Sequence, residues 1–346
     1  MKPITIIVSA AGAPGARALL RSLKENGERE VRIVGTDMSE RSIGRHVCDA
    51  FHLVPAGSDP GFADAMLDVA RREGAVAILP QSSFDLEGLA GAVDRFAAEG
   101  IAVLVSSPDA IDRSNDKAET YAFLQRLGLP APEFRRVAGA AAVEAAAREL
   151  GYPDRPVCFK PVFSSGSRGF RILDPTVDRA NVLLRERPGF VAMRLEEAVE
   201  ILASVDDRTD LLVMELAEGP ERTIDGIANG SEIVLGHPKT REAMRAGLAM
   251  YFETLDDPGL MELSNTIVRE LGIEHFFNIQ LVGGYVIEIN PRISTIVYQE
   301  DLNLPYLGVK RAIGEISDDE LRALRPRIRP GRVALRYFDQ LEFDPA

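Results

Sequence analysis

Apolar positions in the first third of the chain form short runs separated by longer amphipathic stretches. Five runs have the length of a buried strand: Ile4–Ser9, Val31–Thr36, Phe51–Val54, Val76–Leu79 and Ala102–Val105. Three intervening stretches have helical spacing: Ala16–Asn26, Phe62–Glu73 and Leu86–Glu99. Apolar strands that alternate with helices are typical of a parallel sheet covered on both faces. The pattern therefore predicts an N-terminal doubly wound α/β domain over residues 1–113.

The pattern changes at Ser106–Asp116, which is rich in Ser, Pro and Asp and is interpreted as a domain boundary. Ser114 or Asn115 is expected to cap a helix that runs to about Leu127. Beyond it, helices and strands alternate without repeats, and four more strands are predicted at Glu221–Ala228, Ile233–His237, Phe276–Val282 and Tyr285–Asn290. A mixed α+β arrangement is expected for this second part of the chain.

Composition restricts the class of partner. The chain has 346 residues, 46% of them hydrophobic and 27% charged, as in ordinary globular enzymes. Its formal charge of −13 argues against a general nucleic-acid or anionic-membrane partner. There is no apolar stretch of about 18 residues, so no membrane span is expected. The two cysteines suggest no disulfide framework, and we expect a cytoplasmic location.

A glycine turn follows the first predicted strand. Gly12, Gly15 and Ala18 lie where a strand gives way to a helix, and Asp37 ends the second strand. This spacing is similar to a dinucleotide fingerprint, so an NAD(P)-dependent enzyme of the Rossmann type is one hypothesis. The turn lacks the third glycine of the full fingerprint. Its glycines could instead only tighten the turn, or line a substrate cleft.

A lysine and a loop of small residues indicate phosphate binding. Lys160 comes at the end of an apolar strand, and Ser164, Ser165, Gly166 and Ser167 follow it. Small residues leave backbone N–H groups free to surround phosphate oxygens, while a lysine supplies a positive charge. The alternative is a tight hairpin beside a solvated lysine. A second lysine, Lys117, begins the helix after the boundary.

Amide and carboxylate side chains alternate along the last two strands. Glu288 and Asn290 share one face of their strand, and Gln280 lies on the strand before the Gly283-Gly284 turn. A hairpin can bring these oxygens together, and Mg²⁺ prefers a sparse oxygen site completed by phosphates and water. Arg292, further along the same face, could stabilise an anionic intermediate. The alternative is a sheet with one solvated face.

Taken together, these motifs resemble the ATP-grasp superfamily, nearest its carbamoyl-phosphate-synthetase-like branch. The string Glu288-Ile289-Asn290-Pro291-Arg292, the Asn278-Ile279-Gln280 strand, Lys160 with its loop and the Asp116-Lys117 helix start occur in that family's order. The resemblance implies an N-terminal domain over 1–113 and an ATP-grasp domain over 114–315. It also implies a mobile lid over about 135–214, a catalytic core over 215–315 and an extension, 316–346, that packs on the core.

The resemblance also implies roles for individual residues. Lys117, Lys160 and the Ser164–Ser167 loop would contact ATP phosphates, with Lys160 also counted as catalytic. Glu215 and the backbone of Leu216 and Ala217 would bind adenine, and Glu221 the ribose. Gln280, Glu288 and Asn290 would hold Mg²⁺, with Mn²⁺ as an alternative ion, and Arg292 would act at the transition state. Many relatives carry Glu where this chain has Gln280, which leaves Glu288 as the one carboxylate from these two strands.

The implied reaction joins a small carboxylate to an amine through an acylphosphate, with release of ADP. Gly12, Arg241, Arg245, Ser294 and Tyr298 are expected to border the substrates. A catalytically silent ATP-binding protein is a third hypothesis. A homodimer is compatible with the sequence.

Overall fold

The computed structural model describes residues 1–163, 168–187, 189–204, 209–245, 248–294, 299 and 301–343. The chain divides into two compact units. Unit 1 contains Met1–Ile111, Pro220–Ile279 and Asn290–Ala346, and unit 2 contains Asp112–Gly219 and Gln280–Ile289. The chain first passes from one unit to the other between Ile111 and Asp112, close to the expected boundary.

The N-terminal part of unit 1 is the expected parallel sheet. Its strands are β1 (Ile4–Val8), β2 (Val31–Asp37), β3 (Ala50–Leu53), β4 (Ala77–Leu79) and β5 (Ala102–Val103), in the order β3-β2-β1-β4-β5. All neighbouring pairs are parallel. Ile6 and Val8 are buried in a cluster with helix α1 (Ala16–Lys24), whereas Ile7 is buried with helix α3 (Phe62–Glu73). The alternation of the strand thus fills a core on each face.

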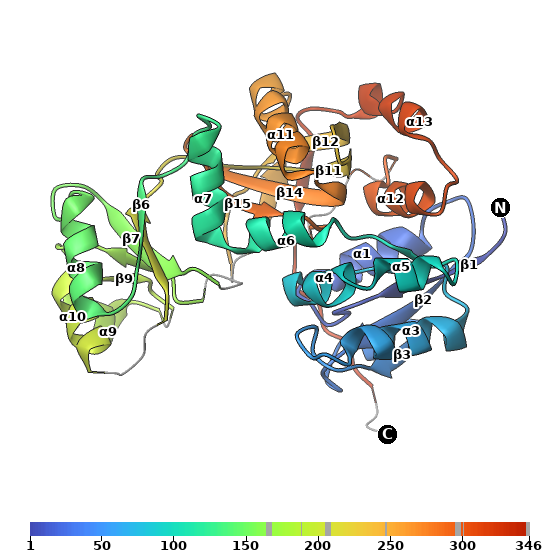
Figure 1. Cartoon of the computed structure of the whole chain (residues 1–346), viewed down its shortest axis with the longest axis horizontal. Coiled ribbons are helices and arrows are strands. Elements are labelled where there is room, and N and C mark those ends of the chain that lie inside the picture. The colour runs from blue at the N-terminus through green and yellow to red at the C-terminus, as the bar shows by residue number, and fades with distance from the viewer. Residues whose placement is uncertain are drawn as a thin grey trace. The chain divides into compact units, whose positions relative to one another are not determined.

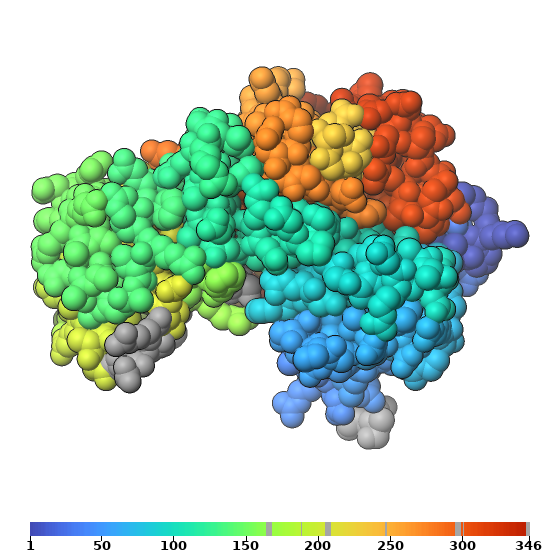
Figure 2. All heavy atoms as spheres, in the orientation of Figure 1, coloured from blue at the N-terminus to red at the C-terminus, as the bar shows by residue number. Residues whose placement is uncertain are grey.

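Helices cover this sheet (Figure 1). The helices on the side of Ile7 are α3, α4 (Ser83–Ala90) and α5 (Val93–Ala97), and α2 (Gly44–Val47) precedes β3. In the space-filling view the side chains of α3, α4 and α5, blue to cyan, hide the strands (Figure 2).

The rest of unit 1 is built on a second, four-stranded sheet. Its order is β12-β11-β14-β15, from β11 (Glu221–Asn229), β12 (Ile233–Thr240), β14 (Glu274–Val282) and β15 (Tyr285–Asn290). Residues 280–282 of β14 and 285–289 of β15 belong to unit 2, so Asn290 is the residue of β15 that lies in unit 1. Helices α11 (Pro258–Leu271), α12 (Leu304–Ala312) and α13 (Asp318–Arg322), the 3-10 turn Arg325–Arg327 and the strand pair β13 (Tyr251–Glu253) and β16 (Val333–Leu335) complete this unit. The C-terminal segment packs here, with Arg325 donating to the carbonyls of Ile233 and Val234.

Unit 2 has its own sheet and core. The sheet order is β6-β10-β7-β8-β9, from β6 (Phe134–Val137), β7 (Val157–Pro161), β8 (Arg171–Leu173), β9 (Ala192–Met193) and β10 (Leu211–Glu215). Helices α8 (Ala140–Glu149) and α10 (Leu195–Ala203) bury Val143, Ala147 and Leu195 against it. Helices α7 (Lys117–Arg126) and α9 (Arg179–Arg185) complete the unit. Among the described residues, no helix is long and apolar enough to cross a membrane.

The segment interpreted as a domain boundary contains a helix that was not expected, α6 (Pro108–Asn115), which begins with a proline whose fixed φ suits a first helical turn. Two expectations about local structure were wrong. The cap of α7 is Asp116, which accepts from the N–H groups of Ala118 and Glu119, and neither Ser114 nor Asn115 has this role. The helix expected over Leu86–Glu99 is two helices, since it is interrupted at Gly91 and Ala92.

The predicted turn between β14 and β15 depends on one of its two glycines. Gly283 has φ 63°, and a Cβ atom there would lie 2.1 Å from the carbonyl oxygen of Glu218. Gly284 has nothing within 4 Å of its Cβ position. The left-handed backbone and the close approach both require glycine at the first position only.

Gly283→Ala should therefore destabilise the protein by about 2 kcal/mol or more, from the strained φ together with the steric contact. Gly284→Ala is the matched control and should change stability by less than about 1 kcal/mol. Urea unfolding of the two variants measures the difference. Equal losses would show that the turn does not have this geometry.

Candidate functional site

Two hydrogen bonds through Tyr121 link Lys160 to the strand that carries Glu288. Its Nζ donates to the Tyr121 hydroxyl at 3.0 Å, and this hydroxyl donates to the carbonyl oxygen of Ile287 at 2.8 Å. Nζ also lies 5.2 Å from the centre of the Tyr121 ring. Tyr121 is fully buried, so the lysine is held by a rigid group in unit 2.

Lys117, Lys160 and Glu288 form one electrostatic group within unit 2. Burial lowers the pKa of Lys160, and the Glu288 carboxylate opposes this shift. Burial also lowers the pKa of Lys117, the charge of Lys160 lowers it further, and Glu288 and Asp116 oppose these effects. Two desolvated ammonium groups that repel each other favour an anionic ligand. Such a ligand would offset both the loss of hydration and the mutual repulsion.

Glu215 and Leu216 form the end of strand β10 in unit 2. The Glu215 carboxylate accepts from the N–H of Glu133 at 3.0 Å, and Arg155 lies 3.6 Å from it. The N–H of Leu216 donates to the carbonyl of Pro156 at 3.1 Å.

In unit 1 a ladder of amide hydrogen bonds leads to Asn290. The Asn278 amide donates to Thr223 Oγ1 at 2.6 Å and to Asp225 Oδ1 at 2.9 Å. Its own oxygen accepts from Asn290 Nδ2 at 3.3 Å, and Asn290 Oδ1 accepts from Arg292 at 3.2 Å. These bonds fix which way each amide points. Asn290 therefore presents its oxygen on the side of Arg292.

A buried ion pair supports this ladder. Lys239 Nζ lies 3.3 Å from Asp225 Oδ2, and both side chains are at most 1% exposed. Burial lowers the pKa of Lys239, and the Asp225 charge opposes this. Asp225, Lys239 and Thr223 were not expected in this role from the sequence. The available signal was a charged residue on each of two largely apolar strands, where an unpaired charge would be very unfavourable.

Arg241, one of the expected substrate residues, occurs in a second cationic group of unit 1. Arg241 lies 2.7 Å from the Glu221 carboxylate, the residue expected at the ribose. Burial lowers the pKa of Arg336, and the neighbouring charge of Arg241 lowers it further. Arg336 belongs to the C-terminal segment and was not expected from the sequence.

The other expected substrate residues of unit 1 are dispersed. Arg245 lies over the ring of Phe338, 4.7 Å from its centre. Ser294 is buried. Tyr298 lies outside the described residues. The same is true of the expected phosphate-binding loop, which consists of Ser164, Ser165, Gly166 and Ser167.

The donor set for a metal is sparse. Among the described residues, no three His, Cys, Asp or Glu side chains are grouped so that they could hold a metal ion. Glu288 is a carboxylate, whereas Gln280 and Asn290 offer neutral amide oxygens, and Asn290 already accepts from a guanidinium. Such donors fit Mg²⁺ only when phosphate oxygens and water complete its shell.

The N-terminal glycine turn has a structural role. The N–H of Gly12 donates to Asp37 Oδ2 at 2.8 Å, and the N–H of Ser39 donates to Oδ1 at 2.9 Å. A Cβ at position 12 would lie 2.7 Å from Ser42 Oγ and 2.8 Å from Asp37 Oδ2. Glycine is therefore needed for packing, and both carboxylate oxygens of Asp37 already accept backbone hydrogen bonds.

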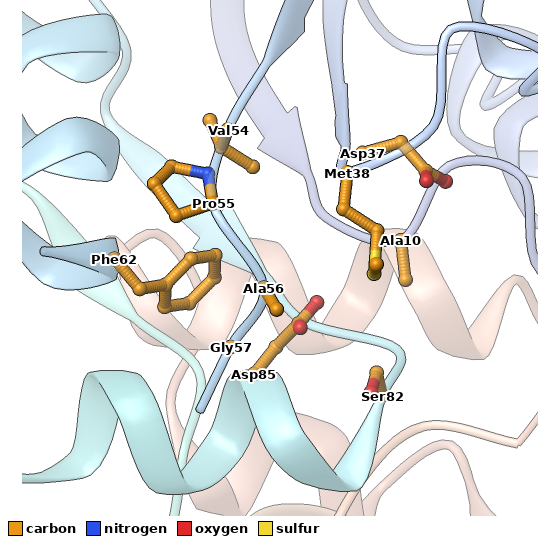
Figure 3. A pocket seen from close by; sticks show the side chains of 10 residues that line it. All are labelled: Ala10, Asp37, Met38, Val54, Pro55, Ala56, Gly57, Phe62, Ser82 and Asp85. Carbon is orange, nitrogen blue, oxygen red and sulfur yellow. The ribbon is translucent and has the colours of Figure 1, made fainter. Parts of the chain in front are cut away.

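A cavity of about 150 Å³ opens at the carboxyl ends of the parallel strands. It lies entirely in the N-terminal domain and is lined by Ala10, Asp37, Met38, Val54, Pro55, Ala56, Gly57, Phe62, Ser82 and Asp85 (Figure 3). The carboxyl ends of strands in a doubly wound sheet are where ligands usually bind. Burial raises the pKa of Asp85 to about 6, the hydrogen bond from Ser9 lowers it, and the charge of Asp37 raises it.

Comparison with known proteins gives two family matches. Residues 207–333 match the family described as "ATP-grasp in the biosynthetic pathway with Ter operon", and residues 6–104 match "PylC-like, N-terminal domain". The chain is similar to the carbamoyl phosphate synthase large chain of Corynebacterium glutamicum, with 29% identity over 218 residues. That match covers 60% of this chain and only 18% of the relative.

Solved structures share the fold. The L-amino acid ligase from Bacillus licheniformis aligns with a TM-score of 0.64 at 16% identity, over 96% of this chain and 78% of that one. The biotin carboxylase domain of Hydrogenobacter thermophilus 2-oxoglutarate carboxylase, solved with MgADP and bicarbonate, aligns with a TM-score of 0.63 at 19% identity, over 95% and 73%.

Breaking the buried ion pair should be costly. Lys239→Met leaves the Asp225 carboxylate buried without its cation and should lose about 3–5 kcal/mol of unfolding free energy. Adding Asp225→Asn should restore part of this loss, which a double-mutant cycle measures. The exposed pair Arg95–Asp64, 2.5 Å apart, is the control, and Arg95→Met should lose less than about 1 kcal/mol. Equal losses for the two pairs would contradict the role of the buried one.

The raised pKa of Asp85 predicts a pH-dependent stability. Folded protein keeps the proton up to about pH 6, whereas the ordinary pKa is 3.8, so wild-type stability should fall as pH rises through this interval. The free energy of unfolding of Asp85→Asn, relative to that of wild type, should rise by about 3 kcal/mol between pH 4 and pH 7. This follows from a shift of about two pKa units at 1.36 kcal/mol each. Urea titrations at both pH values test this, and a pH-independent difference would be inconsistent with a desolvated carboxyl.

Proposed function

The chain belongs to the ATP-grasp superfamily, and on that premise we propose that it is an ATP-dependent carboxylate–amine ligase. The observation that carries this proposal is the group formed by Lys117, Lys160 and Glu288, in which two desolvated cations repel each other near the Glu288 and Asp116 carboxylates. A polyphosphate would offset this repulsion. The fold shared with an amino acid ligase supports the same class of reaction.

In this proposal unit 2 binds the nucleotide. Lys160, fixed by Tyr121, and Lys117 contact the phosphates, and the 164–167 loop, outside the described residues, adds backbone N–H groups. Glu215 accepts from the adenine amino group, and the carbonyl of Leu216 and the N–H of Ala217 complete the adenine edge. Glu221, at the start of β11 in unit 1, is the residue that the resemblance assigns to the ribose.

Gln280, Glu288 and Asn290 would hold Mg²⁺, which when bound neutralises phosphate charge and orients the phosphate chain. Because the set contains one carboxylate, and this carboxylate lies near two buried lysines, the ion is expected to enter together with the nucleotide. Arg292 adds a guanidinium that can stabilise charge on the transferred phosphoryl group or on the anionic intermediate.

The reaction has two steps. A carboxylate oxygen of the first substrate attacks the γ-phosphorus of ATP, the bond from that phosphorus to the bridging oxygen breaks, and ADP leaves. The amine nitrogen then attacks the carbonyl carbon of the acylphosphate, inorganic phosphate leaves, and the nitrogen loses a proton. Positioning and charge neutralisation suffice for such a transfer, so a nucleophilic side chain is unnecessary.

The paired guanidinium groups of Arg241 and Arg336 suit the carboxylate substrate. Two neighbouring guanidinium groups of like charge favour the binding of an anion, which would offset their mutual repulsion. Arg245, Ser294 and Tyr298 follow as further residues of the substrate pocket in this proposal. The substrates are a small carboxylic acid and an amine.

An ADP-release screen over pairs of carboxylic acids and amines tests the function. ADP should form with one acid and one amine together. Lys160→Ala should lower the rate at least about tenfold, since a charge-assisted hydrogen bond to phosphate contributes about 1.5–3 kcal/mol. Lys2→Ala, an exposed lysine outside the site, is the control and should keep the wild-type rate.

Wild-type activity in Lys160→Ala would refute the assigned role of this lysine. Nucleotide binding without turnover on any pair would favour the catalytically silent alternative.

A further inference from the structure

The cavity at the carboxyl end of the N-terminal sheet contains an incompletely paired carboxylate. Asp85 is only 7% exposed, and its Oδ2 accepts from Ser9 Oγ at 2.6 Å. Within the described residues, its Oδ1 has no hydrogen-bond partner. Figure 3 shows this carboxylate directed into the space between Ala56 and Met38.

A second polar group faces the same space. Ser82 occupies the cap position of helix α4, yet its hydroxyl makes no capping hydrogen bond and lines the cavity. Cap serines usually satisfy a free backbone N–H of their helix. This hydroxyl is therefore available as a donor or acceptor for a ligand.

The charge of the lining selects the sign of the ligand. Two of the ten lining residues, Asp37 and Asp85, are acidic, and none is Lys, Arg or His. A buried carboxylate without a cation is unfavourable, and its neighbour of the same sign adds to the cost. A bound positive charge would remove both penalties.

The remaining lining selects an organic cation over a metal ion. Val54, Pro55 and Phe62 form one apolar wall, and Met38 lies opposite (Figure 3). A metal ion would require several oxygen ligands, and no suitable group of three acidic, His or Cys side chains occurs in the described residues. The volume, about 150 Å³, is below the roughly 300–1,000 Å³ of pockets for drug-sized ligands.

We propose that this cavity binds a small amine, with the ammonium group at Asp85 Oδ1 and Ser82 Oγ and the hydrocarbon part against Phe62 and Val54. The ammonium donates to the free carboxylate oxygen, and the apolar wall removes the adjoining methylene groups from water. Such an amine belongs to the class of the second substrate in the ligase reaction, and this link rests on the proposed function. The proposal that the cavity binds an amine does not depend on the proposed function.

Ligand-observed NMR titration of the full chain without nucleotide tests the proposal. The probes are butylamine, its uncharged isostere butanol and the anion butyrate. Butylamine should bind at least about tenfold more tightly than either isostere, as expected for a charge-assisted hydrogen bond. Asp85→Asn should abolish this preference, and Ser82→Ala should weaken butylamine binding about threefold or more.

Asp94→Asn is the matched control, because Asp94 is an exposed carboxylate of helix α5 outside the cavity. It should leave butylamine binding unchanged, and thermal unfolding should show that all three variants are folded. Equal affinity for butylamine and butanol, or an equal loss in Asp94→Asn, would overturn the proposal. Displacement of butylamine by NAD or by millimolar MgCl₂ would overturn it in favour of a cofactor or metal site. Since no ATP is present, failure here leaves the ligase function untouched, and loss of ADP release in Lys160→Ala leaves amine binding untouched.

Discussion

The repulsion between two desolvated lysines is the constraint on which the site of unit 2 depends. Burial lowers the pKa of both Lys117 and Lys160, and the charge of one disfavours the charge of the other. The structure tolerates this because Tyr121 and the carbonyl of Ile287 hold Lys160 in place and because Glu288 lies nearby. An arrangement that is unfavourable alone and favourable with a polyphosphate is preorganised for its ligand, so little reorganisation is needed when the nucleotide binds.

Much of this could be predicted from the sequence because it depends on local pattern. Apolar runs predicted β1 and β7, alternation of polar and apolar residues predicted β15, and Gly283-Gly284 predicted the turn between β14 and β15. Helix α6 was missed because a segment rich in Ser, Pro and Asp is also typical of a loop, and only tertiary packing decides between the two. The fold class was correct because alternating strands and helices allow few architectures.

Other parts of the sites could not be predicted, because they depend on contacts between distant strands. Asp225 and Lys239 are stable in the core only as an ion pair, and the register of β11 against β12 brings them together. Arg336 reaches Arg241 from the far end of the chain. The N-terminal cavity is formed by loops after several strands, and Asp85 was hidden within a segment that reads as an ordinary helix start. The sequence instead suggested Gly12 and Asp37 as ligand-binding residues, but the N–H of Gly12 donates to the Asp37 carboxylate.

The most direct test of the central claim is calorimetric titration of the protein with ATP, with and without Mg²⁺, and with NAD. The account predicts that ATP with Mg²⁺ binds with a clear heat, that Mg²⁺ alone gives none because its donor set needs phosphate oxygens, and that NAD gives none. Lys160→Ala should weaken ATP binding by at least about tenfold. Binding of NAD in place of ATP, or unchanged ATP affinity in Lys160→Ala, would contradict it.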